Sequence, residues 1–251
     1  MSDSEARLRF TEDWYRGFAD DPAVERDLVE LFSGHGPWLG KLSGRVLDVG
    51  GGAGFVARFI DPAVDYWVVD PSRVWREPAL ESLGRKFRQS GPIPHFVEGY
   101  GEQLPFADAD FDSVLAIFSL NHADDPRRCI AEIGRVLRPG GNAYLVLEDV
   151  IPTWGELMRH AFGRIRRRFG FEHHASVGFL SLWDVFPAKL LGKWPLSPDH
   201  IRIDADELIE IANPQMTLKE RRWIEGYLTL TFTRSPAGPD STPKKNLALH
   251  L

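Results

Sequence analysis

Short apolar runs alternate with amphipathic segments along residues 45 to 150. We expect strands near 45–50, 65–70, 93–98, 112–118 and 142–148, and helices near 53–60, 76–88 and 126–138. This alternation is typical of a parallel sheet with helices on both faces. Two further strands are expected near 216–223 and 227–233, around the turn Glu225-Gly226. The pattern thus predicts an α/β fold with a doubly wound, seven-stranded, mostly parallel sheet.

The pattern changes outside this central region and predicts a domain order. Residues 1–44 are expected to be an N-terminal helical segment, because Val24, Leu28 and Phe32 recur at helical spacing. Residues 151–200 interrupt the alternation and are longer than an ordinary connection, so we expect a helical cap or lid insertion over the substrate site. Residues 201–234 are expected to add a C-terminal helix and a β-hairpin, and residues 235–251 a flexible tail.

Composition narrows the class of protein. The net charge is -6, whereas proteins that bind nucleic acid are more often basic, so no nucleic-acid partner is expected. The single cysteine, Cys129, cannot form an intramolecular disulfide, which suits a reducing compartment. No run of about 18 apolar residues is present, and the first residues are polar, so we expect a cytoplasmic protein without a membrane span.

Glycines follow the first strand at a spacing that suggests a ligand. Residues 48–54 read D-V-G-G-G-A-G, and the alternate glycines Gly50, Gly52 and Gly54 allow a sharp turn with close approach to the backbone. Phe55 stands where a nicotinamide-type motif would need its last glycine, and no Lys-Ser or Lys-Thr pair follows as in a P-loop. Cofactor binding of another kind is therefore expected at this turn.

Further motifs follow in order along the chain. Asp70 ends the second predicted strand, about 20 residues after the glycines, where an acid would bind ribose hydroxyls. Residues 101–106 read G-E-Q-L-P-F, residues 111–115 read F-D-S-V-L, and residues 132–141 read E-I-G-R-V-L-R-P-G-G. With the glycine turn, this series resembles the class I S-adenosylmethionine-dependent methyltransferases of the small-molecule branch. The resemblance implies the Rossmann-like fold of that family, with the last strand antiparallel to the rest.

The resemblance also implies a cofactor site for S-adenosylmethionine, with S-adenosylhomocysteine as product. Backbone at Gly50, Gly51 and Gly52 would hold the methionine part, Asp48 its ammonium group, and Asp70 the ribose hydroxyls. We also assign Pro71, Gly101, Glu102 and Phe118 to this site, because they lie at or just beyond predicted strand ends. The adenine side departs from the family pattern, since Tyr100-Gly101-Glu102 stands where Asp-Ala-Glu is usual.

The acceptor is less defined by the sequence. His122 follows the fourth strand, and an imidazole with a pKa near 6.5 suits a general base, which favours O-methylation of a small molecule. Methylation at nitrogen or carbon, of a small molecule or a lipid- or quinone-like acceptor, stays open, as does a cofactor-binding homologue that transfers no methyl group. The adjacent His173-His174 pair lacks a second ligand cluster, so no metal is expected.

The segment Arg164 to Arg168 leaves three interpretations open. It could be a solvated helix face, an anionic-substrate site or a peripheral contact with a membrane surface. An RNA methyltransferase would use such a segment too, but the acidic net charge opposes it. The oligomeric state does not follow from the sequence.

Overall fold

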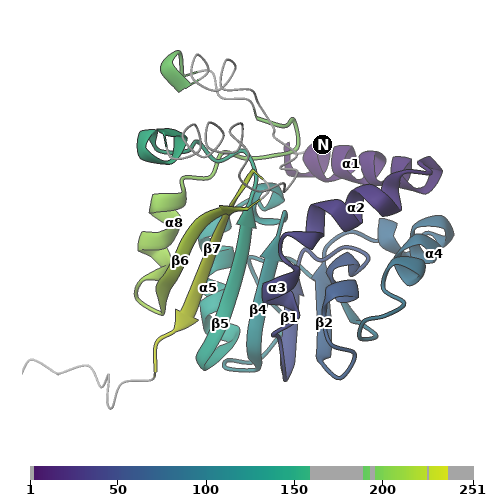
Figure 1. The fold of residues 1–251 in the computed structure, drawn as a ribbon, viewed down its shortest axis with the longest axis horizontal. Helices are drawn as coiled ribbons and strands as arrows, with labels where there is room; N and C mark the ends of the chain where they lie inside the picture. The colour runs from purple at the N-terminus through teal and green to yellow at the C-terminus, as the bar shows by residue number, and fades with distance from the viewer. Residues whose placement is uncertain (1–2, 159–188, 193–195, 225, 237–251) are drawn as a thin grey trace, which may run out of the picture.

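The fold is built on one seven-stranded sheet in the order β3-β2-β1-β4-β5-β7-β6 (Figure 1). It was analysed in a computed structural model that describes residues 3–158, 189–192, 196–224 and 226–236. The strands are β1 Arg45–Val49, β2 Asp65–Asp70, β3 His95–Glu98, β4 Phe111–Ile117, β5 Leu137–Leu147, β6 Met216–Ile224 and β7 Tyr227–Arg234. β1 to β5 pair in parallel, and β7 runs antiparallel to both of its neighbours. The predicted mostly parallel, doubly wound sheet is confirmed.

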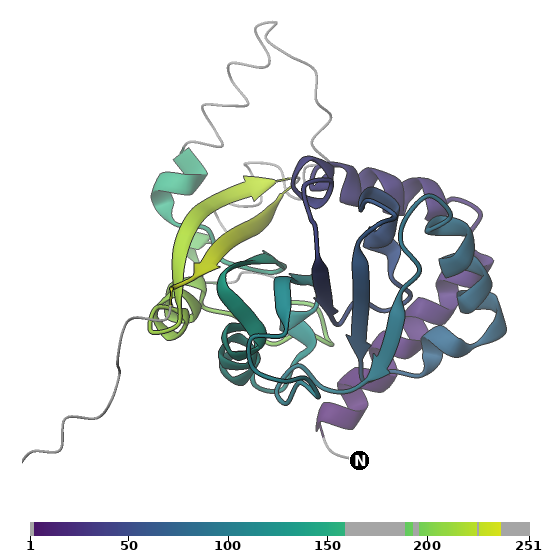
Figure 2. The same ribbon diagram turned by 90° about the horizontal axis from the view of Figure 1, so that it is seen from below.

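Helices cover both faces of the sheet. The α-helices are α1 Asp3–Arg16, α2 Val24–Ser33, α3 Gly36–Leu39, α4 Pro78–Phe87, α5 Pro126–Val136 and α8 Ala205–Ala212. α5 and α8 pack on one face, while α2, α3 and α4 pack on the other. In Figure 2 the β6–β7 hairpin forms the sheet edge far from the purple α1.

Strand alternation divides the core into two layers. In β1, Leu47 and Val49 join the cluster under α5 and α8, whereas Val46 joins the cluster under α2 and α4. Successive strand side chains point to opposite faces, so both halves of β1 are buried only if helices lie on each side. The apolar run of β1 is therefore that of a central strand buried on both faces.

Two predicted boundaries were wrong. The expected helix at 53–60 is a 3-10 helix, Phe55–Phe59, because Gly54 still has a positive φ of 74° and Pro62 follows soon after, which leaves too few residues for an α-helix. The strand expected at 142–148 begins at Leu137, directly after α5, and shifts register against β4 between Phe111 and Ser113. Residues 138–141 lie at this irregularity, between the paired residues Leu137 and Asn142, and Gly140 there has a φ of 80°.

The E-x-x-R motif has a structural role in the described fold. Glu132 Oε2 accepts from the Leu104 amide at 2.8 Å, and Arg135 donates to the carbonyls of Leu104 and Phe106 at 3.0 and 2.8 Å. These bonds tie the loop at residues 104–106 to α5. The L-P-F and E-x-x-R motifs thus hold each other in the fold.

Several expectations fall largely outside the described residues. Most of the proposed cap, including Arg164 to Arg168 and the pair His173-His174, lies there, as do residues 237–251 of the proposed tail. Within the described part of the chain, helices are too short or too polar to cross a bilayer.

Candidate cofactor and acceptor site

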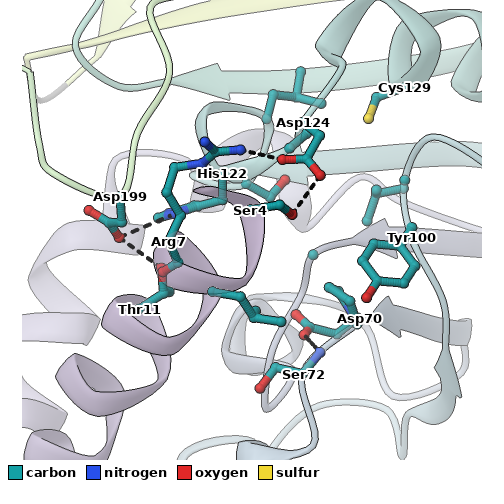
Figure 3. Close-up of a pocket in the computed structure, with 18 of the residues that line it drawn as sticks. Ser4, Arg7, Thr11, Asp70, Ser72, Tyr100, His122, Asp124, Cys129 and Asp199 are labelled. Carbon is teal, nitrogen blue, oxygen red and sulfur yellow. Dashed lines mark hydrogen bonds and ion pairs between the residues drawn. The ribbon is translucent and has the colours of Figure 1, made fainter. Parts of the chain in front are cut away.

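A pocket lies at the carboxyl ends of the parallel strands, beneath α1 (Figure 3). This is the crevice where open α/β sheets bind ligands, next to the point where the strand order reverses between β1 and β4. Seven residues assigned from the sequence line it: Gly50, Asp70, Pro71, Gly101, Glu102, Phe118 and His122. Residues far apart in the chain therefore converge as the strand ends predicted.

The glycine turn places its backbone at the pocket through positive φ angles. Gly50 has φ 68°, and a Cβ there would lie 2.5 Å from the Cβ of Ser119. The Gly50 amide donates to the carbonyl of Val69 at 2.7 Å, and the Gly52 amide donates to Asp70 Oδ2 at 3.0 Å. Ser119 Oγ, by contrast, is buried without a hydrogen-bond partner and is available to a ligand.

Asp70 is held in place by two backbone amides. Its carboxylate accepts from Ser72 at 2.9 Å and from Gly52 at 3.0 Å. Burial raises the pKa of Asp70 to about 6, although these two amide donors oppose the shift. A buried carboxylate with spare lone pairs at the mouth of β2 can accept the two hydroxyls of a ribose.

Asp48, Gly51 and Gly52 do not line this pocket. Asp48 is 2% exposed and lies behind the turn, where Tyr66 donates its hydroxyl at 2.5 Å. Burial raises the pKa of Asp48 to about 7, opposed by the Tyr66 hydrogen bond and reinforced by Asp70. A Cβ on Gly51 would lie 2.5 Å from Asp48 Oδ2, so the acid fixes the turn from within. Direct contact of Asp48 with a ligand ammonium stays a prediction.

Residues Tyr100 to Glu102 form one part of the pocket wall. Gly101 has little room for a side chain, because a Cβ would lie 3.0 Å from Cys129 Sγ and 3.1 Å from Val49 Cγ1. Glu102 accepts from the amides of Asp124 and Asp125, at 2.8 and 3.2 Å, and so holds the loop after β4. Tyr100 lines the pocket with 58% of its surface exposed, which leaves its ring free to contact a ligand.

α1 forms one wall of the pocket and contacts the loops that follow β2 and β4. Ser4 and Arg7 bind the Asp124 carboxylate, Glu12 accepts from the Ser72 hydroxyl at 2.6 Å, and Tyr15 packs on Trp75 with ring centroids 4.3 Å apart. These contacts join residues 60 to 120 positions apart in the chain.

A second polar group lies at the acceptor end of the pocket. His122 Nδ1 stands 3.3 Å from Asp199 Oδ2, and Thr11 donates its hydroxyl to the same oxygen at 2.9 Å. Asp199 is contributed by the segment before α8. Burial opposes ionisation of Asp199, but the contact with His122 and the hydroxyl of Thr11 prevail and lower its pKa to about 2. Thr11 and Asp199 were missed by sequence reasoning, while His122 was assigned.

The glycine turn and the motifs that follow it match a known family model. Residues 47–145 match the model described as "Methyltransferase domain". These residues include β1, β2, β3 and β4, and therefore most of the strand ends around the pocket.

Curated relatives agree with this match. The chain is 30% identical over 174 residues to the uncharacterized methyltransferase YcgJ of Bacillus subtilis, a match that covers 66% of this chain and 64% of the relative. It is 35% identical to the O-methyltransferase rstn1 of Aspergillus nomiae and to the demethylmenaquinone methyltransferase of Renibacterium salmoninarum, over 49% and 44% of this chain. The chain spans 64, 57 and 44% of the lengths of these three relatives.

Solved structures share the fold at low sequence identity. A SAM-dependent methyltransferase of Aquifex aeolicus superimposes with a TM-score of 0.53 at 14% identity, covering 89% of this chain and 98% of its own. The [4+2]-cyclase SpnF gives a TM-score of 0.53 at 16% identity, covering 82% of this chain and 81% of its own. The matched domain and the curated relatives identify residues 47–145 as a methyltransferase domain, and with the shared fold they support the class I S-adenosylmethionine-dependent methyltransferase family.

Proposed function

We propose that the protein transfers a methyl group from S-adenosylmethionine to a small-molecule acceptor, at oxygen. The observation that carries the proposal is the convergence of Asp70, Gly101 and His122 on one pocket at the carboxyl ends of the strands. The family match supplies the cofactor class. The reaction breaks the bond between the sulfonium sulfur and the methyl carbon, forms a bond from the acceptor oxygen to that carbon, and leaves S-adenosylhomocysteine.

The charges of the pocket support a cationic cofactor. Glu12, Asp70, Glu102, Asp124 and Asp199 all line it, and Arg7, the basic residue on α1 at this wall, is tied to Asp124. A sulfonium and an ammonium group are attracted to such a cleft, because walls of low dielectric focus the field of the carboxylates. In this proposal Asp70 accepts from the ribose hydroxyls, and Tyr100 contacts the adenine in place of the usual acid.

The acceptor would sit beyond the methyl group, between His122 and α1. A hydroxyl acceptor must lose its proton as it attacks, whereas a sulfonium leaving group needs no help. His122 is placed to activate such a hydroxyl, since it lines the pocket at the end of β4. The roof formed by α1 would keep water away from the reacting atoms.

The test is methyl transfer by the purified chain to a panel of phenols, catechols, hydroxy acids, amines and quinols. S-adenosylhomocysteine should form with at least one hydroxyl acceptor, and His122→Asn should lower kcat by 10²-fold or more without weakening S-adenosylhomocysteine binding. Transfer with no hydroxyl acceptor, or an unchanged kcat in His122→Asn, would reject O-methylation through this residue.

A carbon acceptor on a quinol ring is the alternative that one relative favours. The relative from Renibacterium salmoninarum is named a demethylmenaquinone methyltransferase. A phenol-type hydroxyl also has to lose its proton before the ring carbon attacks, so the same histidine would serve as the base. Mass and NMR analysis of the methylated product separates oxygen from carbon and nitrogen.

A further inference from the structure

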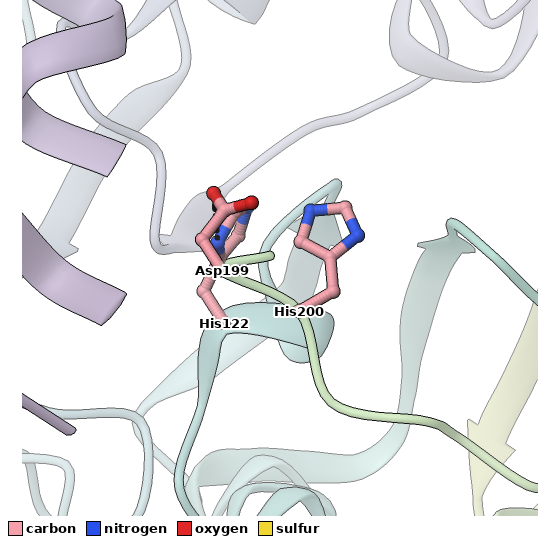
Figure 4. Close-up of side chains that lie close together, drawn as sticks. All are labelled: His122, Asp199 and His200. Atoms are coloured by element: carbon pink, nitrogen blue, oxygen red, sulfur yellow. Dashed lines mark ion pairs between the residues drawn. The ribbon is translucent and has the colours of Figure 1, made fainter. Parts of the chain in front are cut away.

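We propose that His122, Asp199 and His200 form a binding site for one divalent transition-metal ion at the acceptor end of the pocket. The three side chains come together from the turn after β4 and from the segment before α8 (Figure 4). One ligand atom from each lies within 4.8 Å of the others. The role in catalysis rests on the proposed function, because it needs the acceptor to bind beside His122.

The distance between His122 and Asp199 is that expected of two ligands of one ion. The two atoms are 3.3 Å apart, yet His122 Nδ1 is buried and makes no hydrogen bond. Two ligands held about 2.1 Å from a tetrahedral ion stand about 3.4 Å apart. Asp199 is fixed in this position by the Thr11 hydroxyl, which donates to the same oxygen at 2.9 Å.

His200 is oriented as metal-bound histidines are. Its side chain is 7% exposed, and its Nδ1 lies 2.7 Å from Asp149 Oδ2. A neutral ring that donates its Nδ1–H to a carboxylate presents the lone pair of Nε2, which is how an outer carboxylate positions a metal-ligating imidazole. Asp149 itself accepts from the Ser197 amide at 3.0 Å and holds a positive φ of 51°, so its orientation is set by the backbone.

The neighbouring carboxylates favour a cation at this point. Glu148 Oε2 lies 3.7 Å from His200 Nε2, at the edge of the three-residue cluster. The carboxylates of Glu148, Asp149 and Asp199 thus surround two imidazoles, and a divalent ion between them would offset the accumulated negative charge. Mixed imidazole and carboxylate ligands suit Zn²⁺, Co²⁺, Mn²⁺ or Fe²⁺ better than Mg²⁺ or Ca²⁺.

With an ion bound, His122 would serve as a ligand, and the ion would supply the activation of the acceptor hydroxyl that the metal-free site assigns to the imidazole. His122, Asp199 and His200 would hold the ion, which would supply a Lewis acid that lowers the pKa of an acceptor hydroxyl beside the methyl group of the sulfonium. Acceptors with two neighbouring oxygens, such as catechols or hydroxy acids, would chelate the ion and be preferred.

The test is metal binding by the tag-free, full-length chain after removal of metals with a chelator. Calorimetric titration with Zn²⁺, and the visible absorption of the Co²⁺ form, should show one ion per chain. His200→Asn and Asp199→Asn should each weaken Zn²⁺ binding at least 10-fold. His95→Asn is the matched control, because His95 is an exposed histidine 3.5 Å from Asp65 and outside the pocket, and it should leave the affinity unchanged.

S-adenosylhomocysteine binding by each variant is measured in the same preparations. Retained binding shows an intact pocket, so that a loss of Zn²⁺ affinity reports the ligands and not unfolding. No Zn²⁺ binding by the wild type, or equal affinity in His200→Asn and His95→Asn, would overturn the metal site. Failure of S-adenosylhomocysteine to bind the wild type would instead reject the proposed function, which keeps the two failures distinct.

Discussion

Asp70 is the single residue on which cofactor binding should depend most. Its carboxylate has a pKa of about 6, raised by burial, and only the ionised form can accept from both ribose hydroxyls. Affinity for S-adenosylmethionine should therefore be constant above about pH 7 and fall roughly tenfold per pH unit below about pH 6, as protonation competes with binding. Calorimetric titration between pH 5 and 8 measures this. Equal affinities at pH 5 and pH 7 would contradict the assignment, and Asp70→Asn should show weak binding without a step.

Gly101 is predicted to be needed for packing beneath the cofactor. Gly101→Ala would push a methyl group against Cys129 Sγ and Val49 Cγ1, and should lower the free energy of unfolding in urea by about 1–3 kcal/mol. Cys129→Ala in the same chain should recover part of the loss. Gly155→Ala is the control, since nothing lies within 4 Å of its Cβ position, and it should change stability by less than about 1 kcal/mol. Additive losses in the double variant would refute the clash.

Individual site residues were predictable where a motif fixed the backbone. Gly50 and Asp70 follow strands whose ends must meet in a parallel sheet, so their convergence could be inferred from order alone. Thr11 and Asp199 could not, because their contact joins positions 188 residues apart through side chains that carry no local pattern. The hydrogen bond from Tyr66 to Asp48 could not be predicted either, because it joins side chains of two neighbouring strands, and the contact of Asp48 with a ligand ammonium, directly or through water, stays a prediction.

At the scale of elements, the contact between α5 and the loop at residues 104–106 should control the rigidity of the pocket wall. Arg135 donates to two carbonyls of that loop and also pairs with Glu132. Arg135→Lys cannot reproduce this fork, so it should cost about 1–3 kcal/mol in unfolding free energy and weaken cofactor binding.

Arg138→Lys provides the comparison for that change. Arg138 is 44% exposed and pairs with Asp112 at the surface, so its loss should cost less than about 1 kcal/mol. Urea unfolding of the two variants measures both values. Equal effects would mean that the fork on the loop contributes nothing beyond an ordinary surface ion pair.

The elements themselves were predictable from hydrophobic periodicity, and their exact ends were not. All seven strands were expected close to their positions, because buried strands need apolar runs. The 3-10 helix Phe55–Phe59 and the early start of β5 at Leu137 depend on glycine φ angles and on pairing with β4, which are set by tertiary structure.

At the scale of the whole molecule, the acidic pocket should distinguish the charged cofactor from its product. S-adenosylmethionine carries one more positive charge than S-adenosylhomocysteine, and salt screens the attraction of that charge to the surrounding carboxylates. Raising NaCl from about 50 to 500 mM should weaken S-adenosylmethionine binding several-fold more than S-adenosylhomocysteine binding. Parallel titrations measure both, and identical salt dependence would show that the pocket charge does not act on the sulfonium.

The measurement that tests the central claim most directly is calorimetric titration of the purified protein with S-adenosylmethionine and S-adenosylhomocysteine, beside Asp70→Ala. Asp70 lines the pocket together with Gly50 and Tyr100. Its carboxylate is proposed to accept from both ribose hydroxyls, so its removal should weaken cofactor binding strongly. Micromolar binding of both ligands by the wild type, lost in Asp70→Ala, is the expected result. Absence of binding, or equal binding by the variant, would contradict the assignment of this pocket as the cofactor site.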